Sequence, residues 1–137
     1  MSYSSLITYL ALSFVSPTTE SVPNKLEFSQ EGIVSYYHAK FHGKKTSSGE
    51  KYDKTDYTAA HKSLPFNTLI QLENPRNGKV VTVRINDRGP YGKTKRILDI
   101  SQAAAKELDI VKSGIAKLTF KVVGSNGVRW ADVGMLK

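Results

Sequence analysis

Asp87 lies in the part of this 137-residue sequence that is best suited to acid–base chemistry. Residues Lys79 to Ile85 alternate apolar and polar side chains, which predicts a strand with one apolar face. The strand runs into Asn86-Asp87-Arg88-Gly89-Pro90, a cluster of turn-forming residues. A carboxyl group between a strand and a tight turn is held firmly and faces outward, as a proton donor or acceptor must be. The alternative is that Asp87 only bonds the backbone of its own turn, as turn aspartates often do.

Other polar and aromatic residues upstream suit chemistry on a glycan. Glu50 lies in a polar, glycine-containing loop, and His61 lies in the segment TAAHKSLP. Tyr36 and Tyr37 are paired aromatics at the end of an expected strand. In glycosidic bond cleavage an acid protonates the bridging oxygen, a second polar group steadies charge, and aromatic rings hold sugars. Each residue also has an ordinary explanation: a surface charge for Glu50, a buried hydrogen-bonded histidine for His61, and core positions for the tyrosines.

Metal and thiol chemistry have little support in the sequence. Cysteine is absent, which excludes disulfides, thiolate nucleophiles, cysteine zinc sites and a cysteine lipid anchor. His38, His42 and His61 could hold a metal ion, but they lack the helical or CxxC-type spacing of common metal sites. We therefore expect neither a metal nor a cofactor.

Short extended segments separated by turns make up most of the chain. They are expected over residues 33–37, 57–60, 68–73, 79–85, 96–100 and 118–123. Residues 74–78 (NPRNG) predict a tight hairpin, because Asn-Gly supplies the positive φ angles that such a turn demands. Ser101 to Leu108 is the one expected helix, with Ser101 as its N-cap and Asp99 near the positive end of its dipole. Many short strands with one small helix favour a closed β-barrel.

The N-terminal residues differ from the rest of the chain. Leu6 to Val15 form an apolar run that is too short to span a bilayer, followed by small polar residues. This resembles the apolar and cleavage regions of a secretory signal peptide, although no Lys or Arg precedes the run. We expect a leader over residues 1–24, one domain over 25–124 and a tail over 125–137 with Trp130 as its one large side chain. A disordered leader is the alternative.

The body of the chain is strongly basic. From Lys25 onward it holds twenty Lys and Arg against eleven Asp and Glu. Such an excess favours a polyanionic partner: nucleic acid, anionic lipid, or a cell wall that carries anionic polymers. The sequence lacks an arginine-rich run and an RNA-binding aromatic signature, so we expect no nucleic-acid partner. A solvated basic surface without a specific partner is the alternative.

Five sequence blocks, in order, resemble the rare lipoprotein A (RlpA) family of lytic transglycosylases. They are SYY at 35–37, FHGKKTSSGEKY at 41–52, TAAHKSLP at 58–65, NPRNGKVVTVRINDRGPY at 74–91 and RILDISQAAAKEL at 96–108. The resemblance covers about residues 32–123, and five ordered blocks are far more specific than any one of them.

The resemblance implies a mainly β fold, a six-stranded double-psi β-barrel with one short α-helix, as in barwin and expansins. It implies endolytic cleavage of the β-1,4 bond between N-acetylmuramic acid and N-acetylglucosamine in peptide-poor peptidoglycan strands, with a 1,6-anhydro product. The family's acidic residues fall on Glu50 and Asp87 and its histidine on His61. Asp99 matches a further family position, which we interpret as structural. The candidates for substrate binding are Tyr36, Tyr37, Phe41, Lys62, Arg88 and Tyr91.

Asp87 is the expected general acid. It would need a raised pKa, which partial burial and a neighbouring carboxylate would supply. The chain departs from the family in having Tyr36-Tyr37-His38 where Trp-Tyr-Gly is usual. Two alternatives stay open: a hydrolase on the same barrel that activates water, and a non-catalytic wall-binding module of the expansin and barwin kind. We expect a secreted, periplasmic or wall-associated monomer that is not a lipoprotein and has no stable membrane insertion.

Overall fold

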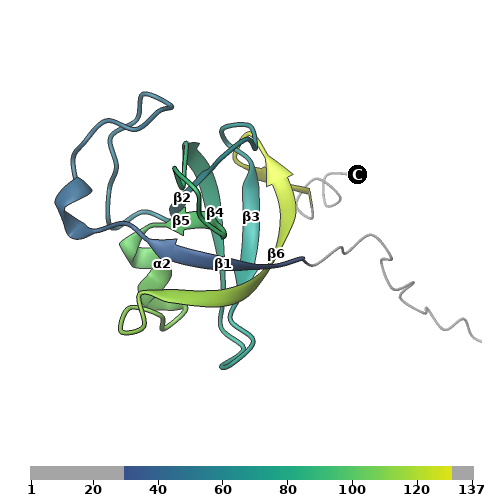
Figure 1. Cartoon of the computed structure of the whole chain (residues 1–137). Helices are drawn as coiled ribbons and strands as arrows, with labels where there is room; N and C mark the ends of the chain where they lie inside the picture. Colours follow the sequence, from purple (N-terminus) through teal and green to yellow (C-terminus); the bar gives the residue numbers. More distant parts are fainter. Residues whose placement is uncertain (1–29, 131–137) are drawn as a thin grey trace, which may run out of the picture.

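Six strands close into a barrel in the computed structural model, which describes residues 30–130 (Figure 1). The pairing order is β1-β5-β2-β4-β3-β6, β6 pairs back with β1, and β7 extends the sheet beyond β6. This closure confirms the expected barrel with one short α-helix, whereas the expected leader lies outside the described residues. In chain order the elements are β1 (Gln30–Tyr36), η2 (Ala39–Phe41), β2 (Thr58–His61), β3 (Leu69–Glu73), β4 (Val80–Asp87), β5 (Arg96–Ile100), α2 (Gln102–Glu107), β6 (Ile115–Ser125) and β7 (Val128–Arg129).

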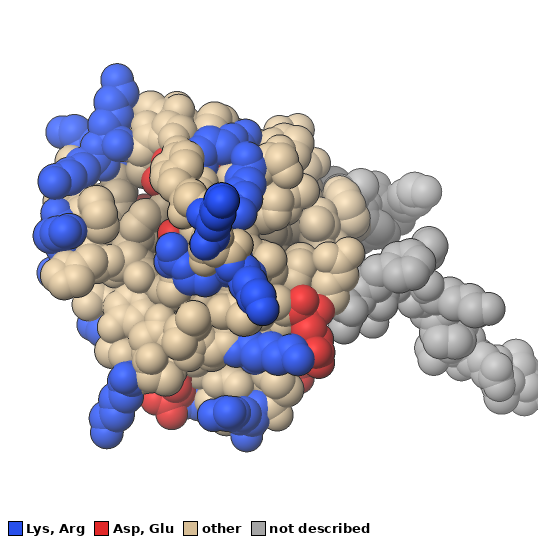
Figure 2. Space-filling model, in the orientation of Figure 1, with Lys and Arg blue, Asp and Glu red and all other residues tan. Residues whose placement is uncertain are grey.

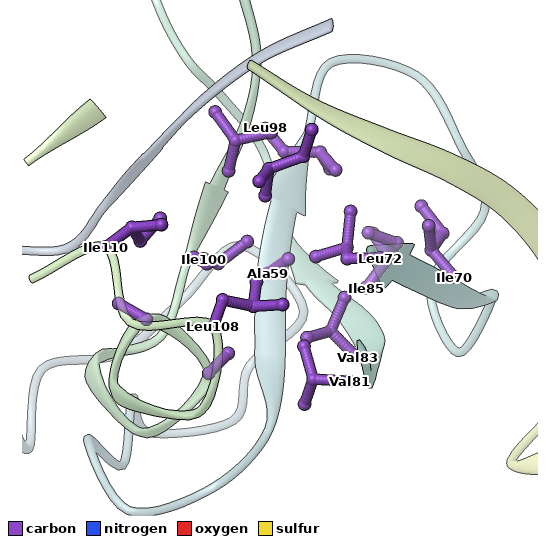
Figure 3. Close-up of a cluster of buried hydrophobic side chains, with 14 residues drawn as sticks. Ala59, Ile70, Leu72, Val81, Val83, Ile85, Leu98, Ile100, Leu108 and Ile110 are labelled. Atoms are coloured by element: carbon purple, nitrogen blue, oxygen red, sulfur yellow. The ribbon is translucent and has the colours of Figure 1, made fainter. Parts of the chain in front are cut away.

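Alternate side chains of the strands fill the barrel. In β4, Val81, Val83 and Ile85 are buried, as their period of two predicts. They pack in one apolar cluster with side chains of the other strands (Figure 3). Leu108 and the buried alanines of α2 join the same cluster, so the helix covers part of the core. Removal of this apolar surface from water is the main stabilising contribution to the fold.

The turn between β3 and β4 is the hairpin that Asn-Gly predicted. The Asn74 amide nitrogen donates to the Lys79 carbonyl at 2.9 Å, and Gly78 has a φ of 74°. The Asn74 and Asn77 side-chain amides both donate to the Leu108 carbonyl, at 2.9 and 3.1 Å. The turn is therefore tied to the end of α2.

Ser101 caps α2 as predicted, since its side chain accepts a hydrogen bond from the Ala104 amide at 3.3 Å. Asp99 has a different partner from the one its position near the helix suggested. Its carboxylate accepts hydrogen bonds from Ser35 Oγ and, at 2.9 Å, from Arg96 Nη1. The network joins β1 to β5, which agrees with a structural role for Asp99.

The long β1–β2 connection, residues 37–57, is anchored by Tyr52, which is only 2% exposed. The Tyr52 hydroxyl accepts a hydrogen bond from the Gln102 amide at 3.0 Å, and an isolated bridge pairs Lys45 with Lys51. Figure 1 shows this connection projecting from the barrel at the left and upper left of the view. The anchor matters because Ser47 and Glu50 lie on this connection.

The strands near the C-terminus differ in length from the expected ones. β6 runs through Ser125, beyond the expected end at residue 123, because it pairs with β1, β3 and β7. The side chain of Trp130, in the expected tail, is 58% exposed. Over residues 30–130 the structure has no helix with the length and apolar character needed to cross a membrane.

Candidate active site

Asp87 is the last residue of β4 and pairs across the sheet with Ala60 of β2. The chain then turns at Gly89, whose φ of 139° strongly favours glycine. A Cβ at position 89 would make only ordinary contacts, 3.8 Å from the Ala60 Cβ, so the backbone angle is what favours glycine here. The turn thus leaves the Asp87 carboxyl group half-buried at the rim of the barrel.

Hydrogen bonds from three residues hold the Asp87 carboxylate. The Tyr37 hydroxyl donates to Oδ2 at 2.6 Å. The backbone amides of Ser47 and Arg88 donate to Oδ1 at 2.9 and 2.8 Å. The bond from Arg88 is the local turn bond expected of an aspartate here. The other two come from Tyr37 and Ser47, both on the β1–β2 connection, so Asp87 has more than a turn-forming role.

The hydrogen bonds also set the charge of Asp87. Burial is the largest single influence on its pKa and raises it, but the bonds from Tyr37, Ser47 and Arg88 together hold the pKa below the usual aspartate range. The expectation of a raised pKa is therefore wrong for the free protein. The sequence could not indicate how many hydrogen bonds oppose the effect of burial on this pKa. With the pKa lowered, Asp87 is a carboxylate at neutral pH.

Tyr37 is a half-buried donor whose hydroxyl points at the Asp87 carboxylate. Burial raises the pKa of its hydroxyl, and the bond to Asp87 and the charge of Asp99 raise it further, so the proton stays on Tyr37. The ring packs against Tyr52, with centroids 4.7 Å apart, and meets Phe41 edge-on at 6.0 Å. These contacts fix the direction in which the hydroxyl points.

Glu50 is held in an ion pair. Arg84 of β4 donates to both of its carboxylate oxygens, at 2.7 and 2.9 Å, and Asn86 Nδ2 donates at 3.1 Å. The bond from Arg84 is the largest influence on the pKa of Glu50 and lowers it. Glu50 is consequently a charged group that fastens the β1–β2 connection to β4.

Glu50 is linked to the end of β4 that carries Asp87. The Asn86 side chain binds Glu50, the Asn86 carbonyl accepts from the Ser48 amide at 3.3 Å, and Asp87 is the next residue. His61 follows Ala60, the β2 partner of Asp87. The three residues predicted as catalytic therefore gather around the ends of β2 and β4, although they bond to different partners.

His61 presents one free ring nitrogen. Its Nδ1 accepts hydrogen bonds from the Ser63 and Leu64 amides at 3.0 and 2.9 Å, so the proton of the neutral ring lies on Nε2. Burial, followed by the charges of Arg88 and Lys62, lowers its pKa. His61 is therefore a neutral donor at pH 7.

The residues expected to bind substrate divide into two groups. Tyr36 donates to the Val111 carbonyl at 3.1 Å and packs against the core. Arg88 lies over the Phe66 ring, 4.0 Å from its centroid, and donates to the Leu64 carbonyl at 2.8 Å. Both of these side chains support the fold locally.

The other candidates are open to solvent. Phe41 is 38% exposed, with Lys40 and Lys44 placing their ammonium groups 5.4 and 5.6 Å from its ring centroid. Tyr91 is 75% exposed and lies beside Gly89, and Lys62 is exposed after β2. Phe41 packs edge-on against Tyr37, whose hydroxyl bonds Asp87, and Tyr91 lies beside Gly89 in the turn that follows Asp87.

All three histidines accept hydrogen bonds from backbone amides. The Nδ1 atoms of His38 and His42 accept from the Lys40 and Lys54 amides at 3.3 and 3.1 Å, as His61 does from its own loop. The described part of the chain has no group of three possible metal-binding side chains. Basic side chains are spread over the face seen in Figure 2, where Lys and Arg outnumber Asp and Glu.

Two contributors escaped the sequence reasoning. Ser47 acts through its side chain and, more strongly, through its backbone amide, for which a sequence has no signal. Arg84 is a polar residue of the alternating strand and lies two residues before Asn86, on the same face, from which it reaches Glu50.

Comparison with known proteins identifies the sequence relatives of the chain. The family described as "Lytic transglycolase" matches residues 29–120. The "Endolytic peptidoglycan transglycosylase RlpA" of Haemophilus influenzae is 45% identical over 112 residues, covering 80% of this chain and 39% of that protein. The protein of the same name from Campylobacter jejuni is 49% identical over 94 residues, covering 69% of this chain and 34% of that protein. The chain thus spans about two-fifths or less of the length of these relatives.

Solved structures support the fold alone. The Streptomyces papain inhibitor superposes with a TM-score of 0.57 at 21% identity, covering 70% of this chain and 94% of that one. Cerato-platanin 3 from M. perniciosa superposes with a TM-score of 0.52 at 15% identity, covering 69% and 95%. Both align with nearly their whole length.

Proposed function

We propose, from the premise that this chain belongs to the lytic transglycolase family, that it is an endolytic peptidoglycan transglycosylase. Its substrate would be the β-1,4 bond between N-acetylmuramic acid and N-acetylglucosamine in peptide-poor strands. The observation that carries the proposal is the Asp87 carboxyl group, held at the barrel rim by Tyr37 and Ser47 with Glu50 and His61 at the same strand ends. The RlpA relatives support the choice of polymer.

Asp87 handles the proton in this mechanism. In the free protein, burial raises the pKa of Asp87, but the hydrogen bonds lower it by more. A glycan lying over the carboxyl group would add to the burial and so raise this pKa. The bound strand therefore favours uptake of a proton by Asp87, which makes it the general acid.

The bond changes balance without water. Asp87 gives its proton to the bridging oxygen as the bond from that oxygen to C1 of the muramic acid breaks. The 6-hydroxyl oxygen of the same muramic acid bonds to C1, and its proton passes to the Asp87 carboxylate. Glu50 is the other possible acceptor of the 6-hydroxyl proton. His61 Nε2 donates a hydrogen bond that orients or polarises a carboxylate. The product carries a 1,6-anhydro ring, and Asp87 has regained its proton.

Digestion of peptide-stripped peptidoglycan, followed by mass spectrometry, tests this function. We expect anhydro-terminated products from the unaltered protein and a rate lower by about a hundredfold or more in Asp87→Asn, since acid–base catalysis contributes roughly that much. Glu107→Gln, an exposed carboxyl group on α2, is the matched control and should keep full activity. An unchanged rate in Asp87→Asn would remove Asp87 as the acid, and products heavier by one water would establish a hydrolase.

A non-catalytic wall-binding module is the second candidate. The lowered pKa of Asp87 favours it, because a carboxylate without a proton cannot act as an acid. Retention on insoluble wall without soluble products would support this candidate. In either case the proposed place of action is the cell wall, outside the cytoplasmic membrane.

A further inference from the structure

A cavity of about 620 Å³ lies at the end of the barrel away from Asp87, between the β3–β4 turn and the α2–β6 connection. Figure 1 shows these two segments at the bottom and lower left of the view, and the β1–β2 connection at the left and upper left. β4 begins just after the turn and reaches Asp87 after eight residues, which span roughly 24 Å. The cavity is therefore separate from the candidate active site.

Basic side chains dominate the polar lining of this cavity. Arg76, Lys112 and Lys117 face it against one acid, Asp109. Lys117 pairs with Glu31 at 3.2 Å, whereas within residues 30–130 no carboxylate pairs with Arg76 or Lys112. Two unpaired cations at one cavity attract an anion, and the planar guanidinium group of Arg76 suits a carboxylate in particular.

Apolar side chains form much of the remaining lining: Ile33, Ile110, Ile115 and Ala116. Apolar walls with a few charged groups are typical of sites that hold small ligands. The expected ligand therefore has a small apolar part next to its carboxylate.

Hydrogen bonds fix the two sides of the cavity to each other. Asn74, which is only 5% exposed, donates to the Leu108 carbonyl and accepts from the Arg76 amide at 3.0 Å. On the other side, the Gly114 amide donates to the Ile110 carbonyl at 3.0 Å. The backbone that carries Arg76 is thus held in place before any ligand binds, which lowers the entropic cost of binding.

We propose that the Arg76 cavity binds a carboxylate carried on a small apolar group of the wall polymer. The choice of polymer rests on the proposed function. Peptidoglycan offers two sources: the lactyl group of N-acetylmuramic acid without a stem peptide, and the C-terminal alanine of a stem peptide. Binding there gives the barrel a second attachment to the wall, which raises the effective concentration of glycan at Asp87.

Titration of the full chain carrying Asp87→Asn, followed by amide NMR spectra, measures this binding without turnover. The probes are the disaccharide GlcNAc–MurNAc, an alanine-terminated stem peptide, and chitobiose, which lacks the lactyl carboxylate. We expect saturable shifts at residues 109–117 with at least one carboxylate probe and none with chitobiose. Arg76→Ala with Lys112→Ala should weaken that binding about tenfold or more, whereas Lys106→Ala, an exposed lysine on α2, should not.

The outcomes separate this site from the active site. Equal shifts with chitobiose, no saturation with either carboxylate probe, or full affinity in the double variant would overturn the proposal. Because no step of the titration requires cleavage, a failure of the transglycosylase assay would leave this result standing, and the reverse also holds.

Discussion

The hydrogen bond from Tyr37 to Asp87 can be removed by deleting one oxygen atom. Tyr37→Phe takes away the donor at 2.6 Å and keeps the ring that packs against Tyr52 and Phe41. The lowered pKa of Asp87 depends on this bond more than on either backbone amide. The variant therefore tests what holds Asp87 in its charged state.

The expected size follows from the kind of bond. A hydrogen bond to a charged group contributes about 1.5–3 kcal/mol, and 1.4 kcal/mol corresponds to a tenfold change in an equilibrium constant. Without the Tyr37 hydroxyl, the proton affinity of Asp87 should rise roughly ten- to a hundredfold. Since a lowered pKa stabilises the fold above the unfolded pKa, the loss of stability in Tyr37→Phe should be full at neutral pH. It should shrink as the pH falls through the pKa of Asp87 in the folded protein.

Carbon NMR titration of the Asp87 carboxyl group measures the change directly. Its midpoint should move to higher pH in Tyr37→Phe. Tyr36→Phe is the matched control, because it removes a hydroxyl that bonds only the Val111 carbonyl, and it should leave the midpoint unchanged. Identical midpoints in Tyr37→Phe and the unaltered protein would refute the reasoning.

Three further changes test other parts of the site. Arg84→Met should raise the pKa of Glu50 and lower stability at neutral pH by at most about 1 kcal/mol, since the ion pair is partly exposed. Denaturant unfolding at a series of pH values should show the difference shrinking as the pH falls through the pKa of Glu50 in the folded protein. His61→Gln should gain stability relative to the unaltered protein as the pH falls below about 6.5, because His61 of the unfolded chain then binds a proton more readily than in the folded protein. If the difference in unfolding free energy between the two proteins stayed constant from pH 8 to pH 5, this prediction would be contradicted. Gly89→Ala should cost about 1–3 kcal/mol in thermal unfolding and reduce activity, whereas Gly43→Ala, with a φ of 84° and open space around it, should cost less and leave activity intact.

The hairpin and the helix start were readable from sequence because their causes are local. Asn77-Gly78 demands a tight turn, and Ser101 supplies a cap for the residues that follow it. The position of Asp87 at a strand end was predictable for the same reason. These features depend on residues within a few positions of one another.

The partners of Asp87 could not be predicted from sequence. Ser47, forty residues away, contributes its side chain and, more strongly, a backbone amide, which every residue but proline has. Of the two tyrosines expected to bind sugar, only Tyr37 reaches Asp87, and the choice depends on where β1 ends. The direction of the pKa change of Asp87 depends on whether the hydrogen bonds, which lower the pKa, outweigh burial, which raises it. Both quantities are known only from the structure.

The pairing that closes the barrel joins residues far apart in the chain. Gln30 of β1 lies opposite Phe120 of β6, and β1 also pairs with β5. Contacts between such distant segments form slowly, because a long loop must close before they contribute any stability. β1 therefore lacks one of its two neighbours until nearly the whole domain has been synthesised. For a chain that is exported as we propose, this order of events keeps the polypeptide open long enough to be threaded through a membrane before it folds.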